Sequence, residues 1–223
     1  MNMLMPEPTR KQKEFAKREG EILSAAISLF EGPHWEQVTV EQISKKADIG
    51  KGTIYKHFSC KEEIYAHIAL GFNKRLMTMF KSVEQTPDIL ATLQTLIRVA
   101  FNFFISNPAE ARVNVSCKRE DFRERLSEEL RAAFEEVETE FQEFVTETLQ
   151  RGMHAGLIPE RPIENLLVGL EATFEGAINM MWNQSIRTVS CHTLNTQEDF
   201  ITVISEFMLA GLVGISPLTN KQG

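Results

Sequence analysis

Hydrophobic residues recur along this chain with the spacing of α-helices. Ile22, Ala26 and Phe30, with Ala25 and Leu29 between them, recur at intervals of three and four residues, and Gly32 and Pro33 end the run. Apolar residues at these intervals line one side of an amphipathic helix. We find no convincing run in which apolar and polar residues alternate strictly, so the pattern predicts an all-α protein.

Shorter elements follow this first helix. Thr39 and Gln42 have the spacing of a capping box, in which a threonine side chain and a glutamine side chain satisfy each other's free backbone N–H groups at a helix start. Ser59 and Glu62 repeat that spacing. The expected elements are a short helix over 39–47, a tight turn at 48–50, a third short helix over about 51–57, and a longer helix that runs through residue 80.

Longer helices are expected in the rest of the chain, with proline and glycine residues marking their ends. The apolar spacing predicts helices over residues 93–104, 122–149, 162–187 and 197–215, and Asn107 and Pro108 should stop the first of these four. The whole chain should contain about nine helices. The short helices lie in the N-terminal part of the chain, and the long helices lie in the rest.

The net charge of −7 is distributed unevenly. Residues 1–61 carry ten Lys and Arg against eight Asp and Glu, whereas the remainder carries 14 against 23. This asymmetry suggests that the N-terminal part meets an anion. The acidic surface of the remainder is explained by solubility more readily than by a specific cationic ligand.

The segment over residues 38–62 holds the most informative motif. Its apolar residues are spaced to pack two short helices against the first one: Val38, Ile43, Ala47, Ile49, Ile54 and Phe58. The remaining residues of the second short helix donate hydrogen bonds to phosphates and base edges, and Gly52 lets the backbone approach a phosphate. Residues 45–61 carry five lysines and one aspartate. Two short helices joined by a tight turn, with a basic second helix, form a helix-turn-helix.

This segment resembles the DNA-binding domain of the TetR family of bacterial repressors. The matching motifs are Thr-Val-x-x-Ile from Thr39, Ala-x-Ile-Gly-x-Gly-Thr-Ile-Tyr-x-His-Phe from Ala47, and Lys-Glu-Glu-Ile-Tyr from Lys61. The similarity covers roughly residues 20–70. Elsewhere the chain resembles the family only in layout, with a glycine turn at residues 152–159 before the last two helices.

The resemblance implies three segments: a basic N-terminal arm at 1–19, a helix-turn-helix domain at 20–66, and an effector-binding and dimerisation domain at 67–223. The residues implied in DNA binding are Thr39, Lys51, Gly52, Thr53, Tyr55, Lys56, His57 and Lys61. Tyr55 could instead belong partly to the core, and His57 could instead stabilise a helix C-terminus. The arm either reaches DNA or is a frayed terminus.

The resemblance also implies a dimer built from the last two helices, whose apolar faces could otherwise pack within one subunit. The interface candidates are Leu166, Leu170, Phe174, Ile204, Phe207, Met208 and Leu212. The candidates for contact with a small-molecule effector are Phe72, Phe101, Phe104, Phe134, Phe141, Phe174, Glu175 and Trp182, most of which would also serve as core. Glu175 would pair with a cationic ligand, or else face solvent or an arginine.

The implied function is a homodimeric repressor that binds a palindromic operator in double-stranded DNA and is released by a small lipophilic or aromatic effector. The alternative is a DNA-binding or architectural factor without an effector. The sequence contains no phosphate loop, HExxH or GxSxG motif and no metal-ligand spacing, so neither an enzyme, a metal nor a cofactor is expected. Cys117 either senses oxidants or is an inert buried thiol. Without a secretory signal or an apolar run of roughly 18 residues, we expect a cytoplasmic protein that meets no membrane.

Overall fold

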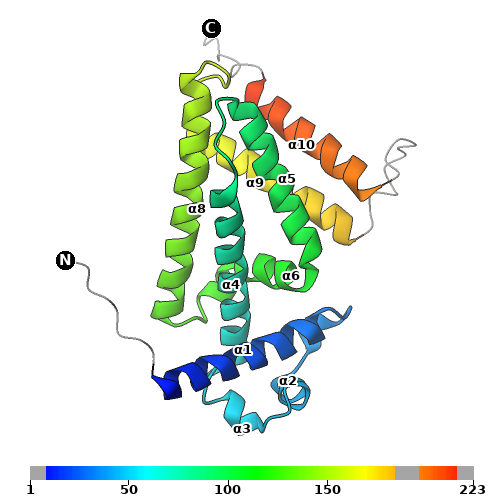
Figure 1. Ribbon diagram of the computed structural model, residues 1–223. Coiled ribbons are helices and arrows are strands. Elements are labelled where there is room, and N and C mark those ends of the chain that lie inside the picture. Colours follow the sequence, from blue (N-terminus) through cyan, green and yellow to red (C-terminus); the bar gives the residue numbers. More distant parts are fainter. Residues whose placement is uncertain (1–8, 184–195, 215–223) are drawn as a thin grey trace, which may run out of the picture. The chain divides into compact units, whose positions relative to one another are not determined.

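The structure, a computed structural model, describes residues 9–183 and 196–214, and all secondary structure within these ranges is helical (Figure 1). The elements are α1 (Arg10–Phe30), the 3-10 helix η1 (Trp35–Gln37), α2 (Val40–Lys46), α3 (Lys51–Ile54), α4 (Lys61–Ser82), α5 (Ile89–Ser106), α6 (Pro108–Cys117), α7 (Glu120–Arg123), α8 (Glu128–His154), α9 (Ile163–Trp182) and α10 (Gln197–Val213). The all-α prediction is confirmed. The expected continuation of two helices to residues 187 and 215 falls outside the described residues.

The chain divides into two compact units. Residues 1–73 and 108–134 form unit 1, and residues 74–107 and 135–223 form unit 2. Both α4 and α8 therefore begin in unit 1 and end in unit 2. The segments 1–19, 20–66 and 67–223 that the sequence suggests are divisions by function, and they stay a prediction.

The first helix begins earlier than the sequence pattern indicated. Residues 10–19, expected to precede it, form the first turns of α1. Thr9 caps the helix in a box with Gln12, whose backbone N–H donates to Thr9 Oγ1 over 3.3 Å. An ion pair of 2.9 Å between Arg10 and Glu14, one turn apart, supports the same helical turns. Capping and charge pairing extend this helix where apolar periodicity gives no signal.

The segment between α5 and α8 also differs from the prediction. Pro108, expected to stop a helix, is the first residue of α6, because proline lacks an N–H that the first turn does not use. Phe122 lies in α7, so the helix expected over 122–149 begins only at Glu128. Phe122, Leu126 and Leu130 are all buried. Their four-residue spacing is the same as that of one face of a continuous helix, and this led to the wrong helix start.

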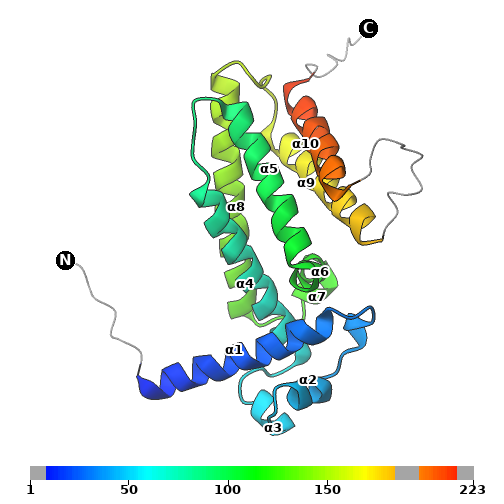
Figure 2. The same cartoon turned by 45° about the vertical axis from the view of Figure 1, so that its right-hand side comes forward.

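The core of unit 2 forms where α5 packs against α9 and α10 (Figure 2). Its buried members are Ile89, Leu93, Leu149, Ile158, Leu166 and Leu212. Among the described helices, α5 alone is long and apolar enough to cross a membrane, although half of it is buried inside the protein. That burial is typical of a core helix.

A glycine turn closes α8. Gly156 adopts a φ of 68°, in the left-handed region, and the N–H groups of Leu157 and Ile158 donate to the carbonyl of Gly152 over 3.0 and 3.1 Å. A side chain on Gly152 would lie 2.6 Å from Ile158 Cδ1, so Ile158 packs where only glycine leaves space. The turn places Ile158 in the core of unit 2.

Candidate nucleic-acid interface

The helix-turn-helix motif rests on a fully buried apolar layer. From α1, Ile22, Ala26 and Phe30 are 0% exposed, as is Ile43 of α2. Ile54 of α3 and Phe58 after it are each 1% exposed. Helices as short as α2 and α3 are not stable alone, so this shared layer holds them in place. Their outer surfaces are thereby fixed relative to each other.

Thr39 caps α2 as the sequence predicts. The backbone N–H of Gln42 donates to Thr39 Oγ1 over 3.2 Å, and the backbone N–H of Thr39 donates to Gln42 Oε1 over 2.7 Å. Thr39 itself is exposed at the start of the helix. The positive end of the helix dipole and an exposed hydroxyl are features that favour a nearby phosphate.

The turn between α2 and α3 depends on Asp48. Its φ of 54° places it in the left-handed region, which aspartate tolerates better than most residues. The N–H of Ile49 then donates to the carbonyl of Ser44 over 3.0 Å. This geometry reverses the chain direction, and Gly50 starts α3 in extended conformation.

The recognition helix α3 is shorter than predicted, since it ends at Ile54 rather than near His57. The chain continues in hydrogen-bonded turns: the N–H of Lys56 donates to the Thr53 carbonyl over 3.1 Å, and that of His57 to the Ile54 carbonyl over 2.9 Å. We call residues 51–57 the recognition segment.

The recognition segment presents polar and basic groups to solvent. Lys51, Gly52 and Lys56 are exposed, Thr53 is half-buried, and the Tyr55 side chain is 48% exposed. Within the described part of the chain no ion pair engages Lys51 or Lys56. Lys45 on α2, by contrast, pairs with Glu41 over 3.1 Å, and this contact holds the pKa of the Glu41 carboxyl below its usual range.

Two of the residues implied in DNA binding are engaged within the protein. The His57 side chain is only 7% exposed, and its ring packs on Phe15 of α1 at a centroid distance of 4.0 Å. Lys61 Nζ donates to the Glu36 carbonyl over 2.7 Å, and burial lowers the pKa of this ammonium group. Both side chains therefore have a structural role that the motif did not reveal.

The interface candidates on α9 and α10 fall into two groups. Leu166, Met208 and Leu212 are buried within the subunit, and Leu170, Phe174 and Ile204 are half-buried. Phe207 is 66% exposed. The same helices carry three exposed apolar residues that the sequence pattern did not indicate as interface candidates, namely Val168, Val203 and Val213. Apolar periodicity marks the face that packs inside the subunit, and it gives no signal for a second apolar face.

The effector candidates do not form one cluster. Phe101 and Phe104 of α5 contact the Phe174 ring at centroid distances of 4.6 and 4.9 Å. Phe141 packs on Phe80 instead, and Phe72 and Phe134 belong to unit 1. Glu175 is half-buried next to Phe174 in the sequence, and Trp182 ends α9 with a buried Nε1 that has no hydrogen-bond partner within the described residues. Of the eight effector candidates, the structure therefore brings only Phe101, Phe104 and Phe174 into mutual contact around the Phe174 ring.

Comparison with known proteins supports the motif. The sequence model of the family described as bacterial regulatory proteins, tetR family, matches residues 22–68. The HTH-type transcriptional repressor KstR2 of Rhodococcus jostii is 25% identical over 154 residues, which are 69% of this chain and 74% of that protein. The matched region contains α2, α3 and their buried layer.

Residues 22–68 are thus similar to the DNA-binding domain of the tetR family of bacterial regulatory proteins.

Further relatives agree on the fold. The nucleoid occlusion factor SlmA of Vibrio campbellii is 22% identical to this chain over 164 residues, 73% of this chain and 82% of that protein. The crystal structure of the transcriptional regulator FadR from Bacillus subtilis, in complex with stearoyl-CoA, superposes with a TM-score of 0.62 and 19% identity, covering 88% of this chain and 99% of that one. Together these comparisons support a DNA-binding transcriptional regulator of the TetR type.

Proposed function

We propose that this TetR-family regulator is a homodimeric repressor in the cytoplasm, which binds a palindromic operator and leaves it when a lipophilic effector binds. The observation that carries the proposal is the recognition segment, where basic and hydroxyl side chains are exposed above a fully buried layer. Rigid positioning of exposed hydrogen-bond donors is what readout of base edges requires. Regulation of transcription, rather than catalysis, is the activity that these features serve.

Each exposed residue of the motif has a proposed role. Lys51, Thr53 and Tyr55 would contact base edges or phosphates in the major groove, where Gly52 allows close approach. Thr39 would contact a phosphate at the start of α2. Lys56 would add a phosphate contact. Lys61 and His57 have less support as DNA contacts because each is already engaged within unit 1.

Dimerisation is supported by the exposed apolar residues of the last two helices. Phe207 and Val168 are each 66% exposed, and Val203 is 45% exposed. Exposed apolar residues concentrated on two adjacent helices are typical of a subunit interface. A dimer also brings two recognition segments to DNA, which explains why a palindromic operator is expected.

An effector site is supported by the aromatic contacts in unit 2. Phe101, Phe104 and Phe174 would contact an apolar chain or ring, and Trp182 Nε1, which has no hydrogen-bond partner within the described residues, is a donor that a ligand could satisfy. The neighbouring FadR structure holds stearoyl-CoA, so a fatty acyl thioester is the first effector class to examine. Binding would favour a conformation whose two recognition segments no longer match successive major grooves.

The test is selection of bound sequences from random duplex DNA by the purified protein. Recovery of an inverted repeat supports a dimeric operator-binding regulator. Salt-sensitive binding without sequence enrichment would refute it. Release of the selected operator on addition of acyl-CoA esters, measured by fluorescence anisotropy, then tests the effector.

A second function is favoured by the SlmA relatives, which are nucleoid occlusion factors. In that case the protein binds specific DNA sites without an effector. A thermal-shift screen discriminates between the two, because a ligand that binds the folded state raises the unfolding temperature. Stabilisation by acyl chains supports the effector-released repressor, whereas no shift with lipophilic and cationic compounds supports the second function.

A further inference from the structure

The first turns of α1 are basic and helical, although they contribute nothing to the core. Residues 10–18 contain five cationic residues and one glutamate, and all of them are exposed. The buried residues of α1 begin only at Ile22. In both Figure 1 and Figure 2 these turns project past α3 within unit 1. Packing of the core therefore does not explain why the helix extends here.

One contact ties this extension to the recognition segment. The Phe15 ring lies 4.0 Å from the His57 ring, and His57 Nδ1 lies 3.7 Å from Glu19 Oε1. The His57 side chain is 7% exposed, so it is almost fully enclosed by its neighbours, Phe15 among them. Because His57 ends the recognition segment, Phe15 fixes the direction of the first turns of α1 relative to α3.

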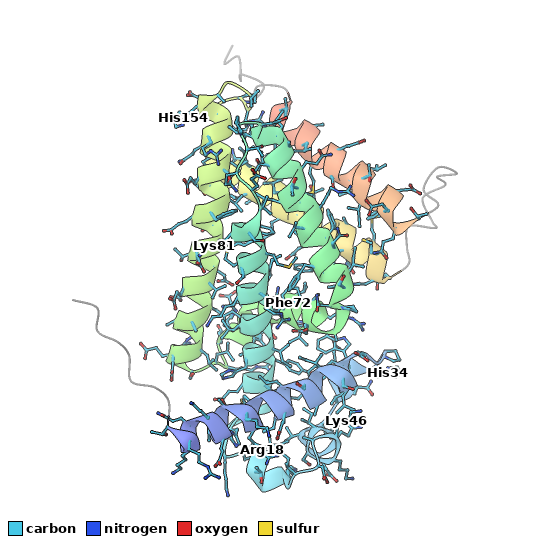
Figure 3. All side chains as sticks on the ribbon, viewed as in Figure 1. Arg18, His34, Lys46, Phe72, Lys81 and His154 are labelled. Atoms are coloured by element: carbon cyan, nitrogen blue, oxygen red, sulfur yellow. The ribbon has the colours of Figure 1, made fainter. Side chains whose placement is uncertain are left out.

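Helical periodicity identifies which cations share the face of Phe15. Residues three and four apart lie on the same side of a helix. Lys11, four residues before Phe15, and Arg18, three residues after it, therefore lie on the side that faces the recognition segment, and Figure 3 labels Arg18 where α1 passes next to α3. Lys13, two residues before Phe15, lies on the opposite side.

The two cations differ in their partners. Arg18 pairs with Glu21 over 2.6 Å and keeps 44% of its side chain exposed. Lys11 forms no ion pair within the described residues. Lys11 is exposed on the side of α1 that faces the recognition segment. Its ammonium group is therefore suited to bind a phosphate of the DNA duplex that the recognition segment contacts.

We propose that Lys11, with Arg18 beside it, binds the DNA backbone outside the groove that α3 reads, and that the contact between Phe15 and His57 positions Lys11. The proposal rests on the proposed operator binding, and it makes His57 a positioning residue rather than a DNA contact. The extended α1 then serves to widen the DNA contact of each subunit.

The first experiment measures operator affinity against salt concentration. Each phosphate contact contributes about 0.9 to the slope of log affinity against log salt. Lys11→Ala removes two contacts from a dimer, so the slope should become shallower by about 1.8. Between 50 and 200 mM salt the affinity difference from the natural protein then shrinks roughly 12-fold. Lys13→Ala removes the same charge from the opposite face and should keep the natural slope.

The second experiment tests positioning without changing charge. Phe15→Ala should make the slope as shallow as Lys11→Ala does, and the double variant should equal Lys11→Ala alone. Phe15→Leu retains an apolar contact and should keep most of the natural slope. Circular dichroism and thermal unfolding of each variant check that the domain is folded.

Equal slopes for Lys11→Ala and Lys13→Ala would overturn the proposal, because charge alone and not position would then matter. A natural slope in folded Phe15→Ala would overturn the role of the Phe15–His57 contact. Failure of the proposed function would be recognised separately, because the natural protein would then select no operator. The salt dependence of binding to random duplex DNA could still be compared between the natural protein and the variants.

Discussion

Residues within and directly after the recognition segment lie in opposite environments. Ile54 and Phe58 are each 1% exposed, whereas Tyr55 between them is 48% exposed. The two buried residues are four positions apart, on one side of the turn, and this leaves Tyr55 on the outer side. The alternative that Tyr55 belongs to the core is therefore not supported. At this scale, burial separates residues that hold the motif together from residues that can meet DNA.

Burial lowers the reactivity of the Cys117 thiol. The thiol is 0% exposed, and burial raises its pKa to about 12 although the nearby Arg123 acts in the opposite direction. Since the thiolate is the reactive form, only a fraction on the order of 10⁻⁴ is reactive at pH 8. This environment favours the inert thiol over the oxidant sensor.

A variant with Cys60→Ser and Cys191→Ser leaves Cys117 as the single thiol. It should react with Ellman's reagent very slowly at pH 8 when folded and completely in guanidinium chloride. The absorbance of the released thionitrobenzoate measures the reaction. Rapid and complete modification of the folded protein would show that Cys117 is accessible and would restore the sensor hypothesis.

At the scale of elements, a capping residue marks where the short helix α2 begins. Thr39 has two assignable roles: it caps α2, which the structure shows, and it contacts a phosphate, which we propose. Thr39→Ala should lower the free energy of unfolding by about 1 kcal/mol because the cap is lost. Thr39→Asp keeps a capping oxygen and adds a negative charge near the DNA.

The two variants separate the roles. Thr39→Asp should unfold near the natural denaturant concentration and yet bind the selected operator more weakly than the natural protein. Thr39→Ser, which keeps the hydroxyl and the capping oxygen, is the control and should keep both properties. Denaturant unfolding and fluorescence anisotropy measure the two properties. Unchanged operator affinity in Thr39→Asp would leave Thr39 with the capping role alone.

The glycine turn after α8 gives a second prediction at this scale. Gly156 is in the left-handed region, and a Cβ there would meet no atom within 4 Å. Backbone strain is therefore the one penalty expected for Gly156→Ala, about 1–2 kcal/mol of unfolding free energy. Gly156→Asn should lose less, because asparagine tolerates this conformation better. Chemical denaturation measures both, and equal loss in the two variants would mean that backbone conformation is not the cause.

At the scale of the whole molecule, the exposed apolar residues of α9 and α10 predict self-association. Phe207→Glu places a charge where an apolar side chain is 66% exposed, so it should convert a dimer into a monomer without unfolding the subunit. Analytical ultracentrifugation measures the mass. Met79→Glu is the matched control, since Met79 of α4 is also an exposed apolar residue, at 40%, and should leave the dimer intact. A monomeric natural protein, or a dimeric Phe207→Glu variant, would refute the predicted interface.

The sequence by itself determined the helical class, the helix-turn-helix and its resemblance to the TetR family, because these depend on local signals. Apolar spacing, capping boxes and the motif over residues 38–62 are each readable within a few turns of chain. The buried layer of Ile43, Ile54 and Phe58 followed from the same spacing. The first helix was found but its start was not, since Thr9 and the Arg10–Glu14 pair contribute no apolar signal.

Only the tertiary structure decided which of the candidate residues share an environment. Phe101, Phe104 and Phe174 come from two helices that lie far apart in the sequence, so no local pattern could separate them from Phe141. The same holds for His57, whose contact with Phe15 joins positions 42 residues apart. The physical reason is that local spacing fixes which side of a helix is apolar, whereas the folded chain fixes what that side, and the opposite side, will meet.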